Sequence, residues 1–113
     1  MIHIAILLRT KANGDWSVVE VEGELDLYTS PDLDRRLQEL IGDGRRRIAI
    51  DLSSVPFMDS SSLSVLVSNL KRLREREGEL ALVGIHGTPL KVLTLTGLTK
   101  IFPLFESTTE LPT

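Results

Sequence analysis

The segment "RRRIAIDLSSVPFMDSSSLSVLV", residues 45–67, carries the strongest structural signal in this chain. Residues 46–52 are nearly all apolar once past the arginines, which is typical of a strand inside a sheet that helices cover. From residue 63 onward, apolar side chains recur at helical spacing, so the pattern predicts a helix over residues 60–77 that stops at Gly78. An acid and three serines, residues 59–62, stand between the two elements. Strand, polar junction and helix together indicate an α/β protein.

The residues before this segment predict a hairpin and a helix. The short apolar run at residues 2–8 and the alternating run at 16–25 read as two strands, and Asn13-Gly14 between them is typical of a tight reversal. Glutamates at every second position of the second strand give that strand one polar face. A helix is expected next, with Thr29 or Ser30 as its cap, Pro31 in its first position, and its end at residues 42–44.

The residues after the segment complete the pattern. We expect a buried strand at residues 79–85, a short helix at 88–97 capped by Thr88, and an edge strand at 101–105. The predicted order is β-β-α-β-α-β-α-β. It corresponds to an α/β fold in one domain over residues 1–113, with a mixed sheet of four to five strands and helices mainly on one face.

Composition excludes several classes of function. The chain has 113 residues, a net charge of −3 and no cysteine, which argues against a nucleic-acid binder, a thiolate metal site and a disulfide scaffold. No apolar run is long enough to span a bilayer and no secretion signal is visible, so we expect a cytoplasmic protein without a membrane partner.

Catalytic and metal-binding patterns are also missing from the sequence. His3 and His86 are the only histidines, and neither has acids at ligand spacing. There is no phosphate-binding glycine loop, and no plausible base stands beside a serine. We therefore predict no catalytic residue, no metal, no cofactor and no enzymatic activity.

The serine cluster has two interpretations. Asp59 and Ser60 are preferred capping residues, and a cap is worth about 1 kcal/mol of stability. Alternatively, Ser60 is suited to a phosphorylation switch, because the start of a helix stabilises an added negative group. A phosphate would add about −1.5 to −2 charges beside Asp59. One like-charge pair with a docked partner, about 4 Å apart at an effective dielectric of about 20, costs on the order of 4 kcal/mol.

Three stretches of the chain resemble the STAS domains of bacterial anti-sigma factor antagonists. "DLSSVPFMDSSSLSVLV", residues 51–67, is similar to their phosphorylation segment. "VVEVEGELDLYTSPDLDRRL", residues 18–37, resembles their turn and first helix. "LALVGIHGTPLKVLTLTGLTKIFPLFES", residues 80–107, resembles their last strand, helix and strand. The resemblance spans about residues 3–107 and implies a STAS fold, with the phosphorylation-site loop and helix at residues 53–77.

The resemblance also implies a function. The serine directly after the aspartate, Ser60, is the implied phosphoacceptor, and Ser61 is the competing one. The partner-facing residues are Asp26, Asp59, Ser61, Ser62 and Ser64. The unphosphorylated protein would bind an anti-sigma factor serine kinase and release the sigma factor, and a serine phosphatase would reset it. Ser62 stands where the family usually has glycine, and its small side chain should still permit close approach by a partner.

Two alternatives remain open at this point. One is a STAS subunit of a lipid-transport ATPase or of a stress-sensing complex. The other is a STAS module that binds a small ligand or a nucleotide. The sequence indicates no oligomeric state, and it does not identify the sigma factor, the kinase or the phosphatase.

Overall fold

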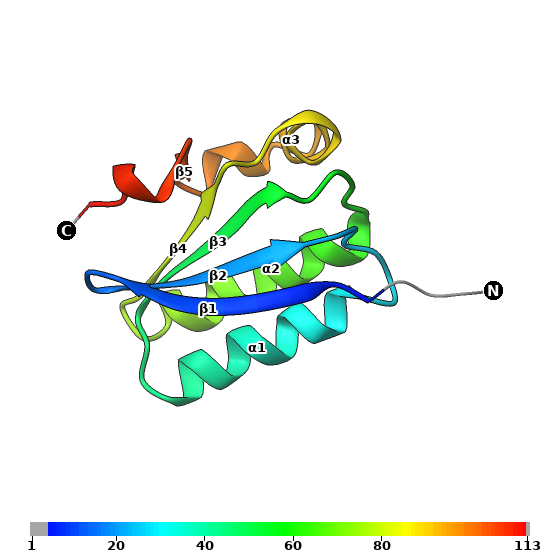
Figure 1. Ribbon diagram of the computed structural model, residues 1–113. Helices are drawn as coiled ribbons and strands as arrows, with labels where there is room; N and C mark the ends of the chain where they lie inside the picture. Colours follow the sequence, from blue (N-terminus) through cyan, green and yellow to red (C-terminus); the bar gives the residue numbers. More distant parts are fainter. Residues whose placement is uncertain (1–4, 113) are drawn as a thin grey trace.

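The computed structural model describes residues 5–112, which form one five-stranded sheet with helices packed against it (Figure 1). The elements are β1 (Leu7–Asn13), β2 (Trp16–Glu22), α1 (Ser30–Gly42), β3 (Arg47–Ser54), α2 (Ser60–Arg74), β4 (Glu79–Val83), α3 (Gly87–Leu95), η1 (Leu98–Lys100), β5 (Leu104–Phe105) and η2 (Thr108–Glu110). The strands lie in the order β1-β2-β3-β4-β5, with β1 antiparallel to β2 and the other pairs parallel. The predicted element order and the mixed α/β sheet are confirmed.

The hairpin exists, but its first strand is displaced from the expected residues. We predicted a strand over residues 2–8, whereas β1 begins at Leu7, and residues 1–4 lie outside the described part of the chain. The polar run after Leu8 pairs with β2 through an antiparallel backbone ladder, and its side chains make cross-strand contacts such as the 3.2 Å ion pair of Lys11 with Glu20. The two-residue loop is Gly14-Asp15, where Gly14 adopts a φ of +60°.

Helices α1 and α2 lie side by side on one face of the sheet and enclose the main core (Figure 1). The largest fully buried side chains of this core are Leu25, Leu33, Leu37, Ile48, Ile50, Leu52, Met58, Leu66, Leu73, Leu80, Leu82 and Leu93. Most of them come from the apolar stripes predicted for the two helices and from alternate positions of the strands. Leu25 and Met58 instead lie in the loops after β2 and β3, and Leu93 comes from α3. Both helices follow parallel strands, so both begin at the same edge of the sheet.

The opposite face of the sheet is partly covered, which the sequence analysis did not predict. A second and smaller cluster of buried apolar side chains lies on this face and consists of Trp16, Val18, Ala49, Ala81, Val83 and Leu111. The C-terminal segment lies against the turn end of the β1–β2 hairpin. There Asn13 Nδ2 donates a 2.8 Å hydrogen bond to Thr108 O, and Trp16 Nε1 donates a 2.7 Å hydrogen bond to the carbonyl of Pro112. The expected polar face of β2 is therefore present only at its far end, where Glu20 is half-buried and Glu22 exposed.

Several predicted boundaries were wrong for local reasons. Helix α2 ends at Arg74 rather than residue 77, because Glu77 enters the left-handed region with a φ of +59° and Gly78 N bonds to Leu73 O at 2.7 Å. His86, not Thr88, is the cap residue of α3. The last strand shrinks to two residues at the predicted edge, because Pro103 precedes it and has no amide to donate.

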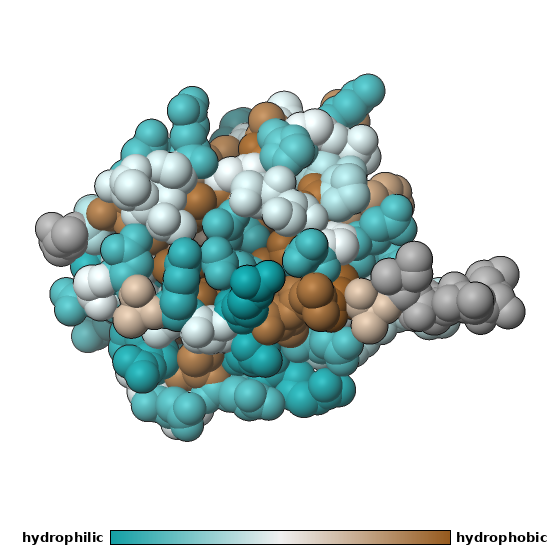
Figure 2. Space-filling view, viewed as in Figure 1, coloured by the Kyte–Doolittle hydropathy of each residue, from teal (hydrophilic) through white to brown (hydrophobic). Residues whose placement is uncertain are grey.

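The surface is largely polar. Figure 2 shows hydrophilic side chains over much of the outer surface near α1 and a hydrophobic group beside the start of β1, where Leu7 is 59% exposed. Across residues 5–112, none of the helices combines the length and the apolar character needed to cross a membrane.

Candidate functional site

Two loops meet at the edge of the sheet where β2 and β3 end. Leu25, in the loop after β2, forms a parallel bridge with Met58, in the loop after β3. Leu25 N donates to Phe57 O at 3.0 Å, and Asp59 N donates to Leu25 O at 3.2 Å. These bonds place the loop at residues 23–29 directly against the start of α2. The topology thus brings together the two motifs that carry most of the predicted site residues.

Asp59 caps helix α2, as the capping interpretation predicted. One of its carboxylate oxygens, Oδ1, accepts hydrogen bonds from the backbone amides of Ser61 at 3.0 Å and Ser62 at 3.3 Å. The same oxygen accepts the hydroxyl proton of Ser61. The carboxylate therefore satisfies first-turn amides that have no partner within the helix, and it places negative charge at the positive end of the helix dipole.

Ser60 is the first residue of α2 and its side chain is exposed. Within the described chain, neither its hydroxyl nor its backbone amide makes a hydrogen bond to another residue. The hydroxyl lies on the first turn of a capped helix, it is open to solvent, and modifying it would break no hydrogen bond to a described residue. These are the properties expected of a serine that another enzyme modifies.

Ser61 and Ser64 have different surroundings. Ser61 is half-buried, and its hydroxyl donates to Asp59 while it accepts a 3.3 Å hydrogen bond from the hydroxyl of Ser30. Ser64 is exposed one turn after Ser60, and its hydroxyl donates to Ser60 O at 3.2 Å. The hydroxyl of Ser61 is therefore engaged by neighbouring side chains, whereas Ser64 shares the open surface of α2 with Ser60.

The prediction that Ser62 faces a partner was wrong. Its side chain is fully buried, and its hydroxyl donates a 2.8 Å hydrogen bond to Leu25 O. At the third position of α2, the side chain turns inward toward the neighbouring loop rather than outward to solvent. A partner docked on the folded domain therefore does not contact this side chain.

Asp26 organises the turn that leads into α1. Its Oδ1 accepts hydrogen bonds from the backbone amides of Tyr28 at 2.9 Å and Thr29 at 3.0 Å. Thr29, one of the two residues that we predicted as the cap of α1, is its cap residue, but its side chain makes no capping hydrogen bond. Its hydroxyl instead donates to Glu24 O at 2.7 Å. Asp26 is half-buried beside Leu25, which places it next to the start of α2.

Sequence reasoning missed the apolar side chains at this edge. Leu27 and Tyr28 are 65% and 69% exposed, and Phe57 is 40% exposed. They flank the junction of the two loops, outside the apolar stripes of the strands and helices. Their position outside these stripes is the sequence feature that could have identified them. Large apolar residues that belong to no core stripe are candidates for contacts with another molecule.

His86, the histidine in the described part of the chain, belongs to no metal-ligating group. His86 is exposed, and its Nε2 lies 3.0 Å from Ser53 O. His3 lies outside the described residues. Among residues 5–112 there is no group of three or more His, Cys, Asp or Glu side chains that could hold a metal ion.

The chain resembles known proteins over nearly its whole length. The family described as "STAS domain" matches residues 8–111. An anti-sigma-B factor antagonist of Staphylococcus aureus is 34% identical over 101 residues, which cover 89% of this chain and 94% of that protein.

Solved structures give the same result. An anti-sigma factor antagonist from Mycobacterium paratuberculosis has 31% identity and a TM-score of 0.82, covering 90% of this chain and 86% of that one. The Bacillus cell fate determinant SpoIIAA in its phosphorylated form has 21% identity and a TM-score of 0.69, covering 87% of this chain and 90% of that one. The SpoIIAA match is a likeness of fold.

Proposed function

This chain belongs to the STAS domain family, and from that membership we propose that it acts as an anti-sigma factor antagonist. In its unphosphorylated form it binds an anti-sigma factor serine kinase, and the kinase then releases a sigma factor. Phosphorylation of Ser60 breaks the complex, and a serine phosphatase restores the binding form. The supporting observation is the exposed hydroxyl of Ser60, without a hydrogen bond to any described residue, on the first residue of α2 beside Asp59.

Electrostatics explains how such a switch would work without unfolding the domain. A phosphoryl group on Ser60 adds about −1.5 to −2 charges at the start of a helix, where the dipole favours negative charge. Asp59 already occupies the amides of Ser61 and Ser62, so the phosphate would remain at the surface. A partner carboxylate about 4 Å away would then meet a repulsion on the order of 4 kcal/mol at an effective dielectric of about 20.

Hydrogen bonding favours Ser60 over Ser61 as the acceptor. The kinase must reach a hydroxyl oxygen and remove its proton. Ser61 is half-buried and its proton is engaged by Asp59, so phosphorylating it would remove the hydrogen bond of its hydroxyl to Asp59 and disturb the contact with Ser30. Ser60 loses nothing on modification.

The partner surface in this proposal surrounds Ser60. It includes Asp26, Asp59, Ser61 and Ser64 from the sequence-based prediction, and it adds the exposed side chains of Leu27, Tyr28 and Phe57. Apolar and aromatic side chains at the centre of a contact supply most of its affinity, while charged residues set specificity and association rate. A phosphate placed among them therefore acts where it most weakens binding.

A binding experiment tests the proposal. The immobilised chain is exposed to a lysate of its source organism with ADP or ATP, and captured proteins and the chain itself are analysed by mass spectrometry. We expect a small serine kinase to be retained with ADP, and one phosphate to appear on Ser60 with ATP. Ser60→Asp should weaken capture, and Ser60→Ala should retain the kinase even with ATP.

Ser107→Asp is the charge-matched control, because Ser107 is an exposed serine in the C-terminal segment. It should capture the kinase like the parent. If Ser60→Asp and Ser60→Ala both bind the kinase as the parent does in the presence of ATP, the switch does not exist. Capture of a transporter ATPase instead would indicate a transport subunit. Saturable nucleotide binding by the purified chain, without any kinase, would indicate a ligand-binding module.

A further inference from the structure

Ser62 connects the loop before α1 to the first turn of α2 from inside the protein. Its fully buried hydroxyl donates to Leu25 O at 2.8 Å. The same carbonyl accepts the Asp59 amide at 3.2 Å, so Leu25 O receives one backbone and one side-chain hydrogen bond from the start of α2. The Ser62 hydroxyl also lies 3.4 Å from Asp59 Oδ1, but a hydroxyl has one proton, and the shorter contact takes it.

The carbonyl of Leu25 lies at the base of an exposed turn. Leu25 directly precedes Asp26, whose carboxylate binds the amides of Tyr28 and Thr29 and makes residues 26–29 one compact unit. Leu27 and Tyr28 project from this unit at 65% and 69% exposure. The placement of both side chains relative to Ser60 therefore depends on how firmly Leu25 is bound to α2.

We propose that Ser62 is a positioning residue for partner recognition, whose hydroxyl fixes the 26–29 turn against the phosphoacceptor end of α2. The inference rests on the proposed function, because the partner is the serine kinase. A kinase that contacts the turn and Ser60 together must order both, and a turn already fixed lowers that cost. Ser62 touches neither the kinase nor the phosphate, so the reaction at Ser60 itself is unaffected by it.

Ser62→Ala tests this role because it removes the hydroxyl and keeps the β-carbon. We expect hydrogen exchange at the amides of residues 26–29 to become about fivefold faster, the factor that corresponds to one lost hydrogen bond. The KM for phosphorylation by the serine kinase that the parent chain captures should rise about as much, with kcat unchanged. Ser62→Gly should behave likewise or show a larger effect.

A variant of similar stability separates positioning from general destabilisation. Ile48→Val shortens a buried side chain near the start of β3, at the opposite end of the strand from Ser60. It should speed exchange in the central strands while leaving the 26–29 amides and the KM at parent values.

The outcomes are distinguishable. If the 26–29 amides exchange no faster in Ser62→Ala than in Ile48→Val, or if exchange rises while the KM does not, the positioning role is overturned. If the parent chain is not phosphorylated by any captured kinase, the proposed function itself fails. In that case the exchange comparison still decides whether Ser62 holds the turn.

Discussion

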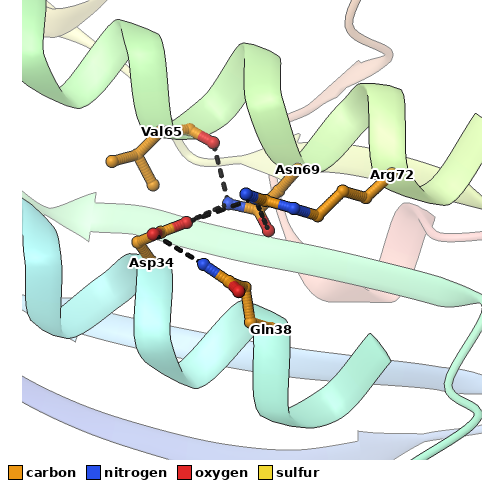
Figure 3. A network of polar contacts seen from close by, with 5 residues as sticks. All are labelled: Asp34, Gln38, Val65, Asn69 and Arg72. Atoms are coloured by element: carbon orange, nitrogen blue, oxygen red, sulfur yellow. Dashed lines mark hydrogen bonds and ion pairs between the residues drawn. The ribbon is translucent and has the colours of Figure 1, made fainter. Parts of the chain in front are cut away.

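The side-chain amide nitrogen of Asn69 lies 2.8 Å from Asp34 Oδ1, and this hydrogen bond joins the two helices that cover the sheet (Figure 3). Asn69 is fully buried in α2, where its nitrogen also donates to Val65 O at 2.9 Å. Its oxygen accepts a 3.1 Å hydrogen bond from Arg72 Nη1. Both ends of the amide are thus satisfied, which is the condition for tolerating a buried polar group. The network sets the register of α1 against α2, and with it the relative position of their first turns.

Asn69→Ala should destabilise the domain by about 1–3 kcal/mol, because Asp34 loses its buried donor and a space opens between the helices. Urea unfolding followed by circular dichroism measures the change. Gln38→Ala is the control: Gln38 is exposed and donates to the other oxygen of Asp34 at 2.8 Å, so its loss should cost less than about 0.5 kcal/mol. Equal effects of the two substitutions would show that the buried amide is not what holds the helices together.

Removing the cap of α2 should also lower stability. Asp59→Ala eliminates the acceptor for the amides of Ser61 and Ser62 and should cost about 1–2 kcal/mol in the free energy of unfolding. Asp59→Asn keeps an acceptor oxygen and loses only the favourable charge at the helix start, so it should cost about 0.3–1 kcal/mol. Denaturant titration of the parent and the two variants gives the order of their free energies of unfolding. A fully stable Asp59→Ala protein would contradict the capping geometry.

The two candidate acceptors should behave oppositely when truncated. With the captured kinase and ATP, Ser61→Ala should still gain one phosphate, because the exposed hydroxyl of Ser60 is untouched. Ser60→Ala should gain none, because the remaining hydroxyl at Ser61 is engaged with Asp59 and half-buried. Intact-mass measurement over time distinguishes them. Phosphate on Ser60→Ala at the parental rate would move the assignment to Ser61.

Much of the architecture followed from local patterns in the sequence. The run from residue 46 to 52 was recognisable because a strand inside a parallel sheet is apolar on both sides. Helix α2 was recognisable because its leucines repeat at helical spacing. The displacement of β1 was not recognisable, because this strand is mostly polar and exposed, and its position is set by pairing with β2 across the hairpin. No pattern within a single strand records such pairing.

The site was predicted in part. The position of Ser60 at the start of a helix followed from capping rules, and the structure leaves its side chain exposed. The orientation of Ser62 could not be predicted from capping rules, because three adjacent serines at a helix start point in three different directions. Contact with the neighbouring loop decides which of them is buried.

Two glycines, one at the end of α1 and one just after α2, should respond in opposite ways to the same substitution. Gly78 ends the turn after α2, and a β-carbon there would lie 2.5 Å from Arg46 O and 3.1 Å from Leu73 O, both of them backbone atoms. Gly78→Ala should therefore destabilise the domain by about 1–3 kcal/mol, because the backbone must shift to make room.

Gly42 ends α1, and a β-carbon there meets nothing within 4 Å. Gly42→Ala should raise stability by about 0.4–1 kcal/mol, because alanine has less conformational freedom to lose than glycine. Thermal unfolding of both variants measures the contrast. The added methyl group is the same in each protein, so opposite signs identify the close approach of Arg46 to Gly78 as the reason for glycine there. Destabilisation of both by the same amount would instead mean that helix ends in this fold reject any side chain.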